Sequence, residues 1–258
     1  MADPLPISVV IVAKNEAQNL PRCLASVQGW VAEIVVALND TTDDSAAVAA
    51  GFGARVQTTP WQGYRDTKNA ALAFANHDWV LSLDADELVS PELRRELEAF
   101  FARGDGTRFA GAQFPRKVWF INRWICHGDW YPDLSLRQLH RPRARWGGDA
   151  FVHEKAECDG PVATLRGDLL HHPFPTIATY QGKSLEYARL FVEKQVAQDR
   201  PWSLSATLFR PAWRFFRAYI LRRGFLDGFP GFVAAVATCY YTFLRYTCHY
   251  ERIHRTGP

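Results

Sequence analysis

The stretch Trp79-Val80-Leu81-Ser82-Leu83-Asp84-Ala85-Asp86-Glu87 decides how this chain folds, because a largely apolar run ends in three carboxylates. The apolar part predicts a buried strand. Alternate side chains of a strand point to the same face, so we expect Asp84 and Asp86 to point together at one ligand. Open α/β sheets bind ligands beyond the carboxyl ends of their strands. The stretch therefore predicts a ligand site at that edge.

The acidic cluster predicts a divalent-metal site for a nucleotide diphosphate. Carboxylates packed this closely repel one another and are costly to desolvate unless a cation lies between them. Mg²⁺ typically takes one or two carboxylates together with the oxygens of a diphosphate. The alternative is a solvated acidic turn before a helix, because Ser90 is a good N-cap and Pro91 suits the first helical position.

The composition indicates one large domain, or one domain with an appended subdomain. The chain has 258 residues, of which 48% are hydrophobic, and its net charge of +3 does not indicate nucleic-acid binding. Five widely spaced cysteines without a Cys-x-x-Cys pair support neither a disulfide framework nor a zinc site. Residues 1–6 lack a basic segment followed by an apolar one, so we expect no secretory signal and a cytoplasmic protein.

Strand and helix patterns alternate along the first part of the chain. This alternation predicts an α/β fold with right-handed crossovers and a mostly parallel central sheet. Strands are expected at residues 7–13, 34–38, 55–58 and 79–83, and helices at residues 20–27, before Gly51 and at 66–76.

Two further segments have different patterns. Residues 105–175 contain short strands, many aromatic residues and turn residues, which predicts a mixed-sheet extension. Residues 176–258 are expected to be helical, and they are aromatic and basic between Trp202 and Tyr250. We expect this last segment to lie on an anionic membrane surface rather than to span it, because its uncharged stretch, 229–244, is short and interrupted by Gly and Pro. The alternative is that these helices pack on the catalytic domain or on a second subunit.

Several ordered motifs resemble those of inverting glycosyltransferases of family 2, which have the GT-A fold. These motifs are residues 13–16 (Ala-Lys-Asn-Glu), 39–44 (Asn-Asp-Thr-Thr-Asp-Asp), 63–72 with Lys68-Asn69, 83–87 (Leu-Asp-Ala-Asp-Glu) and 152–154 (Val-His-Glu). Further segments resemble the branch of lipopolysaccharide-core β-glucosyltransferases: residues 124–133, Arg137, 167–171 and the Arg-Gly-Phe-Leu-Asp-Gly run at 223–228.

The resemblance implies a division of labour along the chain. Residues 1–104 would form the nucleotide-sugar-binding half, 105–175 the acceptor-side half of the same catalytic domain, and 176–258 the membrane-associating segment. The implied contacts to a UDP-sugar donor come from Ala13, Asn15, Glu16, Asn39, Asp40, Lys68, Asp84 and Ala85. Leu38 stands where the family commonly has an Asp, so Asn39 and Asp40 would supply the acceptor atoms for the uracil N–H.

The resemblance also implies the catalytic groups. Asp86 would hold a Mg²⁺ or Mn²⁺ ion that bridges the two phosphates, with Asp84 on the ribose or a metal-bound water. His171 is a further candidate ligand on its own chemistry, because an imidazole can complete a coordination shell. A buried core histidine is the alternative for His171. Glu154 is the candidate general base, with Asp133 as its rival. The candidate acceptor residues are His127, Trp130, Tyr131, Arg137 and His153; the aromatic residues among them could equally belong to the core.

The expected reaction is metal-dependent transfer of a hexose, glucose from UDP-glucose, to a heptose of a lipid-linked inner core at the cytoplasmic face of the inner membrane. A nucleotidyltransferase that makes a sugar nucleotide is disfavoured because Lys14-Asn15-Glu16 lacks the glycines of a triphosphate loop. A non-catalytic, membrane-associated module that binds a sugar nucleotide remains the other alternative. The residues decide neither the donor sugar nor the oligomeric state.

Overall fold

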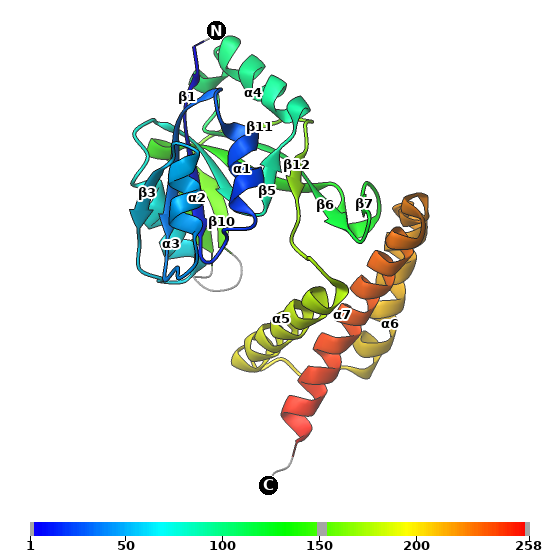
Figure 1. Cartoon of the computed structure of the whole chain (residues 1–258). Helices are drawn as coiled ribbons and strands as arrows, with labels where there is room; N and C mark the ends of the chain where they lie inside the picture. Colours follow the sequence, from blue (N-terminus) through cyan, green and yellow to red (C-terminus); the bar gives the residue numbers. More distant parts are fainter. Residues whose placement is uncertain (1–2, 149–153, 256–258) are drawn as a thin grey trace. The chain divides into compact units, whose positions relative to one another are not determined.

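The structure is a computed structural model that describes residues 3–148 and 154–255 (Figure 1). The chain divides into two compact units. Unit 1 comprises Met1–Arg116 and Asp133–His171, and unit 2 comprises Lys117–Pro132 and His172–Pro258. The sequence led us to expect boundaries at residues 104 and 175, whereas the chain here leaves unit 1 at residue 116, returns at residue 133 and leaves again at residue 171.

The first part of unit 1 is a parallel sheet covered by helices, as the alternating pattern predicts. The strand order is β3-β2-β1-β4. The strands are β1 (Leu5–Ala13), β2 (Val31–Leu38), β3 (Arg55–Thr58) and β4 (Trp79–Asp84), and the helices between them are α1 (Leu20–Val27), α2 (Ser45–Gly51) and α3 (Tyr64–Leu72).

Both faces of this sheet are buried because β1 is apolar on both sides. Val9 packs in one hydrophobic cluster with residues of α1, and Val10 packs in a second cluster with residues of α3. The register pairs Ala13 with Leu38 and Val12 with Asp84, so the three central strands end at the same edge. That edge is where the candidate site lies.

The rest of unit 1 adds antiparallel strands to β4, so the sheet is mixed beyond that point. The order continues β4-β8-β6-β12-β5. These strands are β5 (Glu87–Val89), β6 (Gly111–Phe120), β8 (Asp133–His140) and β12 (Leu169–His171); β11 (Val162–Thr164) pairs with β6, and β9 (Ala144–Gly148) pairs with β10 (Glu154–Cys158) in a separate ribbon. Short 3-10 turns lie at η1 (Asp105–Thr107) and η3 (Arg141–Arg143).

Helix α4 (Pro91–Ala102) begins as the sequence predicts. The Ser90 hydroxyl accepts a hydrogen bond from the Leu93 N–H at 3.1 Å, and Pro91 occupies the first helical position. The short strand β5 separates this helix from the acidic cluster. The acidic stretch is therefore not the first turn of the helix.

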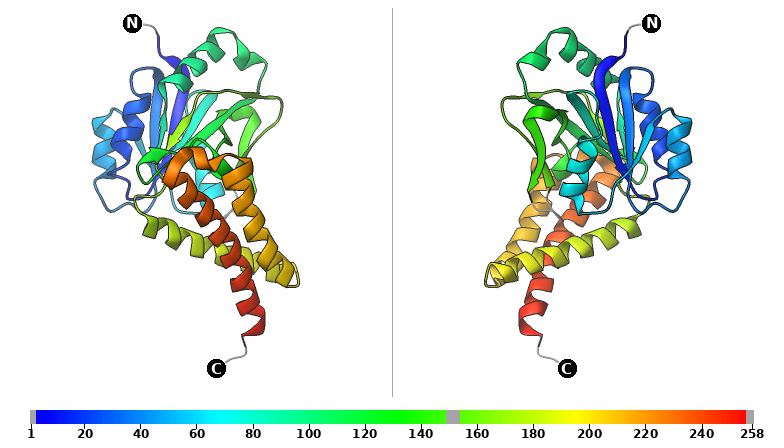
Figure 2. Two further views of the ribbon diagram at one scale, coloured as in Figure 1. Left: turned by 90° about the vertical axis from the view of Figure 1, so that its right-hand side faces the viewer. Right: turned by 90° about the vertical axis from the view of Figure 1, so that its left-hand side faces the viewer.

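Unit 2 is helical, as expected for residues after 175. Helices α6 and α7 pack against each other and lie side by side in gold and in orange to red (Figure 2), and α5 also packs on α7. The elements are β7 (Arg123–Trp124), η2 (Gly128–Trp130), α5 (Ile177–Ala197), α6 (Leu204–Phe216), the π-helical turn η4 (Arg217–Leu221), η5 (Gly224–Asp227) and α7 (Gly228–His254). Among the described residues, no helix combines the length and the apolarity that crossing a bilayer requires.

The aspartate of the Arg-Gly-Phe-Leu-Asp-Gly run binds a distant segment of the chain within unit 2. The buried carboxylate of Asp227 accepts hydrogen bonds from the backbone N–H groups of Cys126 (2.9 Å) and His127 (2.8 Å). It also lies 2.9 Å from the Nδ1 atom of His127. Gly231 is required nearby, because a Cβ atom there would lie 2.1 Å from the carbonyl oxygen of Gly224.

Candidate active site

The loops that follow β1 and β2 are tied to each other. The Oδ1 atom of Asn15 accepts a hydrogen bond from the backbone N–H of Thr42 at 2.8 Å. The backbone N–H of Glu16 donates to the hydroxyl of Ser45 at 2.9 Å. The structure thus brings together the two loops that the sequence predicts to converge on a nucleotide.

The loops after β1 and β2 each contain a short polar residue with a positive φ angle. Asn15 and Asp40 have φ angles of 55° and 45°, in the left-handed region that favours Gly, Asn and Asp. Asn39 is buried, and its backbone N–H donates to the carbonyl of Ala13 at 3.1 Å. The Asp40 carboxylate is exposed and lies 3.5 Å from the Lys14 ammonium. Leu38 stands where the family commonly has an Asp, and Asn39 and Asp40 are the two candidate replacements. Of these two, Asp40 is the more accessible.

Asp84 lies between two cationic side chains at the end of β4. Its carboxylate oxygens are 2.6 Å from a guanidinium nitrogen of Arg137 and 3.1 Å from the Lys68 Nζ atom. Burial acts to raise the pKa of Asp84, but the charges of Arg137 and Lys68 outweigh it and hold the pKa well below its usual value. Asp84 is therefore an anion whose charge the protein itself balances.

Lys68 links Asp84 to the candidate base. Its Nζ atom also lies 3.2 Å from the Oε1 atom of Glu154, and it sits 4.4 Å from the centre of the Trp146 ring. The neighbouring Asn69 fixes that tryptophan, because its amide exchanges two 2.9 Å hydrogen bonds with the backbone of Trp146. The Lys68-Asn69 motif thus joins α3 to both β4 and β9. No sequence pattern indicated a role for Trp146, since one aromatic residue in a short strand is ordinary.

Glu87 forms the buried floor of the site. Its side chain is fully buried, with one oxygen 2.8 Å from Arg137 and 3.4 Å from Arg116. The other oxygen accepts a hydrogen bond from the Asp84 backbone N–H at 2.9 Å. The roles of Glu87 and Arg116 were not predicted from the sequence, although the position of Glu87 directly after Asp84-Ala85-Asp86 could have indicated that it belongs to the site.

Arg137 and Asp133, both predicted site residues, take part in the same ion-pair network. Arg137 is 6% exposed and is held between Asp84 and Glu87, which raises its pKa because two buried carboxylates outweigh the effect of desolvation. Asp133 pairs with Arg116 at 2.7 Å and is 45% exposed. The predicted acceptor role of Arg137 and the predicted base role of Asp133 stay predictions.

Asp86, in the turn between β4 and β5, lies beside His171 of β12. Strands β5 and β12 pair antiparallel with His171 opposite Glu87, which places the His171 Nε2 atom 3.4 Å from an Asp86 carboxylate oxygen. The side chains are 22% and 13% exposed. Ala85, between the two aspartates, is buried. The sequence predicted both Asp86 and His171 as metal ligands, and the structure brings them within reach of one ion.

The other candidate acceptor residues belong to unit 2 or lie outside the described residues. His127 contacts Asp227, and the Trp130 indole N–H donates to the Thr238 hydroxyl at 3.0 Å. Lys117 lies over the Tyr131 ring at 5.3 Å. His153 lies outside the described residues. The roles of these residues at an acceptor are not tested by their contacts.

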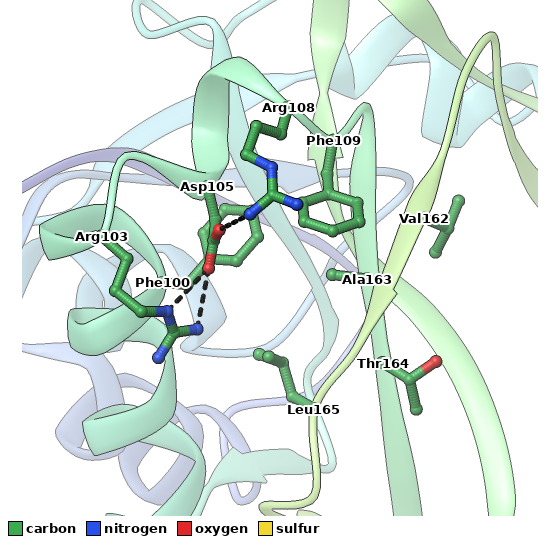
Figure 3. A pocket seen from close by; sticks show the side chains of 9 residues that line it. All are labelled: Phe100, Arg103, Asp105, Arg108, Phe109, Val162, Ala163, Thr164 and Leu165. Atoms are coloured by element: carbon green, nitrogen blue, oxygen red, sulfur yellow. Dashed lines mark hydrogen bonds and ion pairs between the residues drawn. The ribbon is translucent and has the colours of Figure 1, made fainter.

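An open cavity of about 690 Å³ lies elsewhere in unit 1 (Figure 3). Its apolar wall includes Phe100, Phe109 and Leu165, and at its rim Arg103 and Arg108 both pair with Asp105. None of its lining residues belongs to the carboxylate network described above. Both guanidinium groups of this cavity are already paired with Asp105. The cavity is separate from the candidate site, which lies at the carboxyl ends of the strands.

The comparisons with known proteins show the family of this chain. The family model described as Glycosyl transferase family 2 matches residues 8–151, which include both tied loops, Lys68 and the acidic stretch. The chain belongs to this family. An uncharacterized glycosyltransferase of Rickettsia typhi is 30% identical to it over 249 residues, which cover 93% of the chain and 85% of that protein.

Two further similarities extend over nearly the whole of this glycosyltransferase. The lipopolysaccharide core biosynthesis glycosyltransferase LpsC of Rhizobium meliloti is 29% identical, with 98% of this chain and 94% of that protein covered. Among solved structures, S. aureus TarS 1–349 has a TM-score of 0.48 at 14% identity and covers 97% of this chain and 93% of that one. This glycosyltransferase has the expected GT-A fold, with a parallel sheet continued by a curled mixed sheet and followed by C-terminal helices.

Proposed function

We propose that this glycosyltransferase transfers a hexose, with inversion, from a UDP-hexose to a heptose of a lipopolysaccharide inner core. The observation that carries the proposal is the connection of Glu154 through Lys68 to Asp84, because it unites the candidate base with the acidic stretch in one site. The near full-length likeness to LpsC supports the choice of acceptor. Glucose as the donor sugar rests on the family resemblance.

The residues fit a divalent cation that is shared with the donor. Asp86 and His171 offer an oxygen and a nitrogen 3.4 Å apart, and the buried Nδ1 atom of His171 has no hydrogen-bond partner among the described residues. No group of three or more His, Cys, Asp or Glu side chains among the described residues could hold a metal by itself. Mg²⁺ usually completes its shell with waters and substrate phosphates. When bound, the ion would supply positive charge to the leaving diphosphate.

Glu154 is proposed to take the proton of the acceptor hydroxyl. The hydroxyl oxygen then forms the new bond to the anomeric carbon, the bond from that carbon to the diphosphate oxygen breaks, and UDP leaves with the electron pair. The Lys68 ammonium fixes the orientation of the Glu154 carboxylate, since it holds one of its oxygens at 3.2 Å. Asp133, which pairs with Arg116, remains the rival base.

The loops after β1 and β2 are proposed to bind the nucleoside. Asn15 and Glu16 lie on one loop and Asp40 on the other, and the hydrogen bonds between the loops fix their spacing before the donor arrives. Asp40 exposes a carboxylate that can accept the uracil N–H. A preformed loop pair of this kind lowers the entropy lost on binding.

Unit 2 is proposed to bind the cytoplasmic face of the inner membrane. Helix α6 exposes Phe209, Trp213 and Phe216, of which Phe209 is 73% exposed. Helix α7 exposes a second stripe at helical spacing, formed by Phe229, Phe232, Val236, Tyr240 and Phe243. Aromatic residues beside arginines suit the interface of an anionic leaflet. The lipid-linked acceptor would be met at that surface.

The test is a transfer assay with defined truncated core acceptors and a panel of UDP-sugars, each with Mg²⁺, with Mn²⁺ and with a chelator. We expect UDP-glucose to be used only when a divalent ion is present. Glu154→Gln should still bind donor but lose about 100-fold or more of its turnover, because the hydroxyl proton has no acceptor. Glu157→Gln is the control, since Glu157 is an exposed carboxylate of the same strand that pairs with Arg145.

Two results would contradict the proposal. Transfer that persists unchanged in chelator would exclude the metal-dependent reaction. Near-normal activity of Glu154→Gln together with an inactive Asp133→Asn variant would move the base to Asp133.

A further inference from the structure

Three arginines of unit 2 surround one buried carboxylate. Asp129, in the turn η2, is 3% exposed. Its oxygens lie 3.2 Å from Arg214, 3.3 Å from Arg217 and 3.6 Å from Arg222. The turn is held in place because the backbone N–H of Gly128 donates to the carbonyl of Arg222 at 2.9 Å. The cluster therefore has a fixed inner anion and three cations around it.

This cluster carries more positive than negative charge. Three guanidinium groups and one carboxylate leave an excess of two positive charges. Between Trp202 and Tyr250 the sequence has six arginines and a single acid, Asp227, which already binds the segment at Cys126 and His127. Residues 202–250 contain no other acidic residue that could balance the excess.

The guanidinium groups also keep donors that the carboxylate does not use. Both oxygens of Asp129 and the Nε atom of Arg214 are buried without a hydrogen-bond partner among the described residues, so the ion pairs lack the bidentate geometry that arginine favours. The three arginine side chains are 30–44% exposed. Burial and the neighbouring charges of Arg217, Arg245 and Arg222 lower the pKa of Arg214 despite Asp129. The side chains repel one another and face solvent.

We propose that Arg214, Arg217 and Arg222 bind a phosphate ester group carried by a lipid, with Asp129 positioning them from the inside. The inference rests on the proposed lipid-linked acceptor. Guanidinium forks match phosphate oxygens in geometry and in charge. Phe209, Trp213 and Phe216 are exposed on the same helix as Arg214, so an apolar surface adjoins the cluster. An amphiphile with an anionic head and an apolar body complements both features.

The phosphate could belong to a membrane phospholipid or to a phosphorylated sugar of the acceptor, and two probes separate these sources. The first is vesicles of phosphatidylcholine with or without phosphatidic acid, measured by flotation. The second is soluble glycerol phosphate, with chloride at equal ionic strength as its control, measured by titration calorimetry. Neither measurement needs a donor sugar or turnover, so failure here is distinct from failure of the proposed reaction.

The variants are Arg217→Gln and Arg222→Gln, each of which leaves Asp129 with two arginines. We expect each to weaken binding to phosphatidic acid vesicles about fivefold, since one arginine near an anionic surface contributes about 1 kcal/mol. Arg252→Gln is the matched control, because Arg252 is an exposed arginine in the last turn of α7. Circular dichroism and the thermal midpoint confirm that each variant is folded.

The outcomes separate cleanly. Binding of both probes that depends on Arg217 and Arg222 but not on Arg252 supports the site. Dependence seen only with glycerol phosphate supports the site and assigns the phosphate to the acceptor sugar. Equal losses in all three variants would show a general electrostatic attraction and overturn the site, and so would a failure of the protein to bind both probes.

Discussion

Arg137→Met removes the cation that two carboxylates share at the end of β4. Arg137 is 6% exposed and lies 2.8 Å from Glu87, whose side chain is fully buried. The variant leaves Glu87 with Arg116, at 3.4 Å, as the one remaining ion-pair partner within the described chain. Breaking a buried ion pair from one side typically costs about 3–5 kcal/mol, because a charge remains desolvated. We expect a loss of unfolding free energy in that range.

An exposed pair of the same chemistry provides the control. Arg95 lies 2.9 Å from Glu92, nearly the same distance, but the two side chains are 70% and 64% exposed. Arg95→Met should therefore cost about 0–1 kcal/mol. Urea unfolding measures the free energy of unfolding of both variants. The two losses show the effect of burial, because the ion pairs have the same chemistry and nearly the same length.

The double variant Arg137→Met/Glu87→Gln tests the cause of the loss. Neutralising Glu87 removes the stranded charge, so the double variant should be more stable than the sum of the two single losses implies. A loss for Arg137→Met no larger than that for Arg95→Met would refute the argument that this network depends on burial. Additive single losses would refute the direct coupling of Arg137 to Glu87.

Two further predictions concern the same edge of the sheet. The pKa of Asp84 is held below its unfolded value of about 3.9, so its contribution to stability is complete above that pH and is lost as the pH falls through the folded pKa. Asp84→Asn should thus lose less stability than the wild type between about pH 5 and about pH 3, by urea unfolding; equal losses would contradict it. Asp86→Asn and His171→Ala should each weaken Mn²⁺ binding about tenfold or more, measured by water-proton relaxation in the presence of UDP. Glu98→Gln, at an exposed pair with Arg94, should leave that binding unchanged, and unaltered binding in both site variants would remove Asp86 and His171 from the metal.

The helices and strands of the first hundred residues could be predicted because their signals are local. The apolar positions of Leu20–Val27 recur at helical spacing, and the observed helix α1 has those bounds. β1 is apolar on both faces, which is typical of a parallel strand covered by helices on both sides. The polar residues after β1 and β2 could be placed at one edge of the sheet, because the carboxyl ends of parallel strands meet at the same edge.

The connections of the site could not be predicted, because they join segments far apart in the sequence. Lys68 meets Glu154 across 86 positions, and Arg137 meets Asp84 across 53. These contacts depend on the register of β4 with β8 and on the position of the β9–β10 ribbon, which no local pattern specifies. Sequence reasoning listed Arg137 as a candidate acceptor residue, and that role stays a prediction, but nothing in the sequence indicated that its guanidinium group would lie beside Asp84 and Glu87.

The boundaries of the two units also could not be predicted from the composition. Strand β6 is one continuous element, yet unit 1 ends within it at Arg116 and residues 117–132 belong to unit 2. The hydrogen bonds from Cys126 and His127 to Asp227 explain why that excursion groups with the C-terminal helices, since they tie it to a residue about a hundred positions later. A change in composition marks where one pattern ends, but it cannot show that the chain leaves a unit and returns.

The charge balance at the end of β4 alters what a metal ion has to do there. From the sequence, closely packed carboxylates are expected to require a cation between them, and the structure supplies cations from the protein. Lys68 and Arg137 pair with Asp84, and Arg137 and Arg116 pair with Glu87. The proposed divalent ion is therefore not needed to hold the strand end together. We propose the ion at Asp86 and His171, where the donor's diphosphate would match its charge, so we expect ion and donor to bind together.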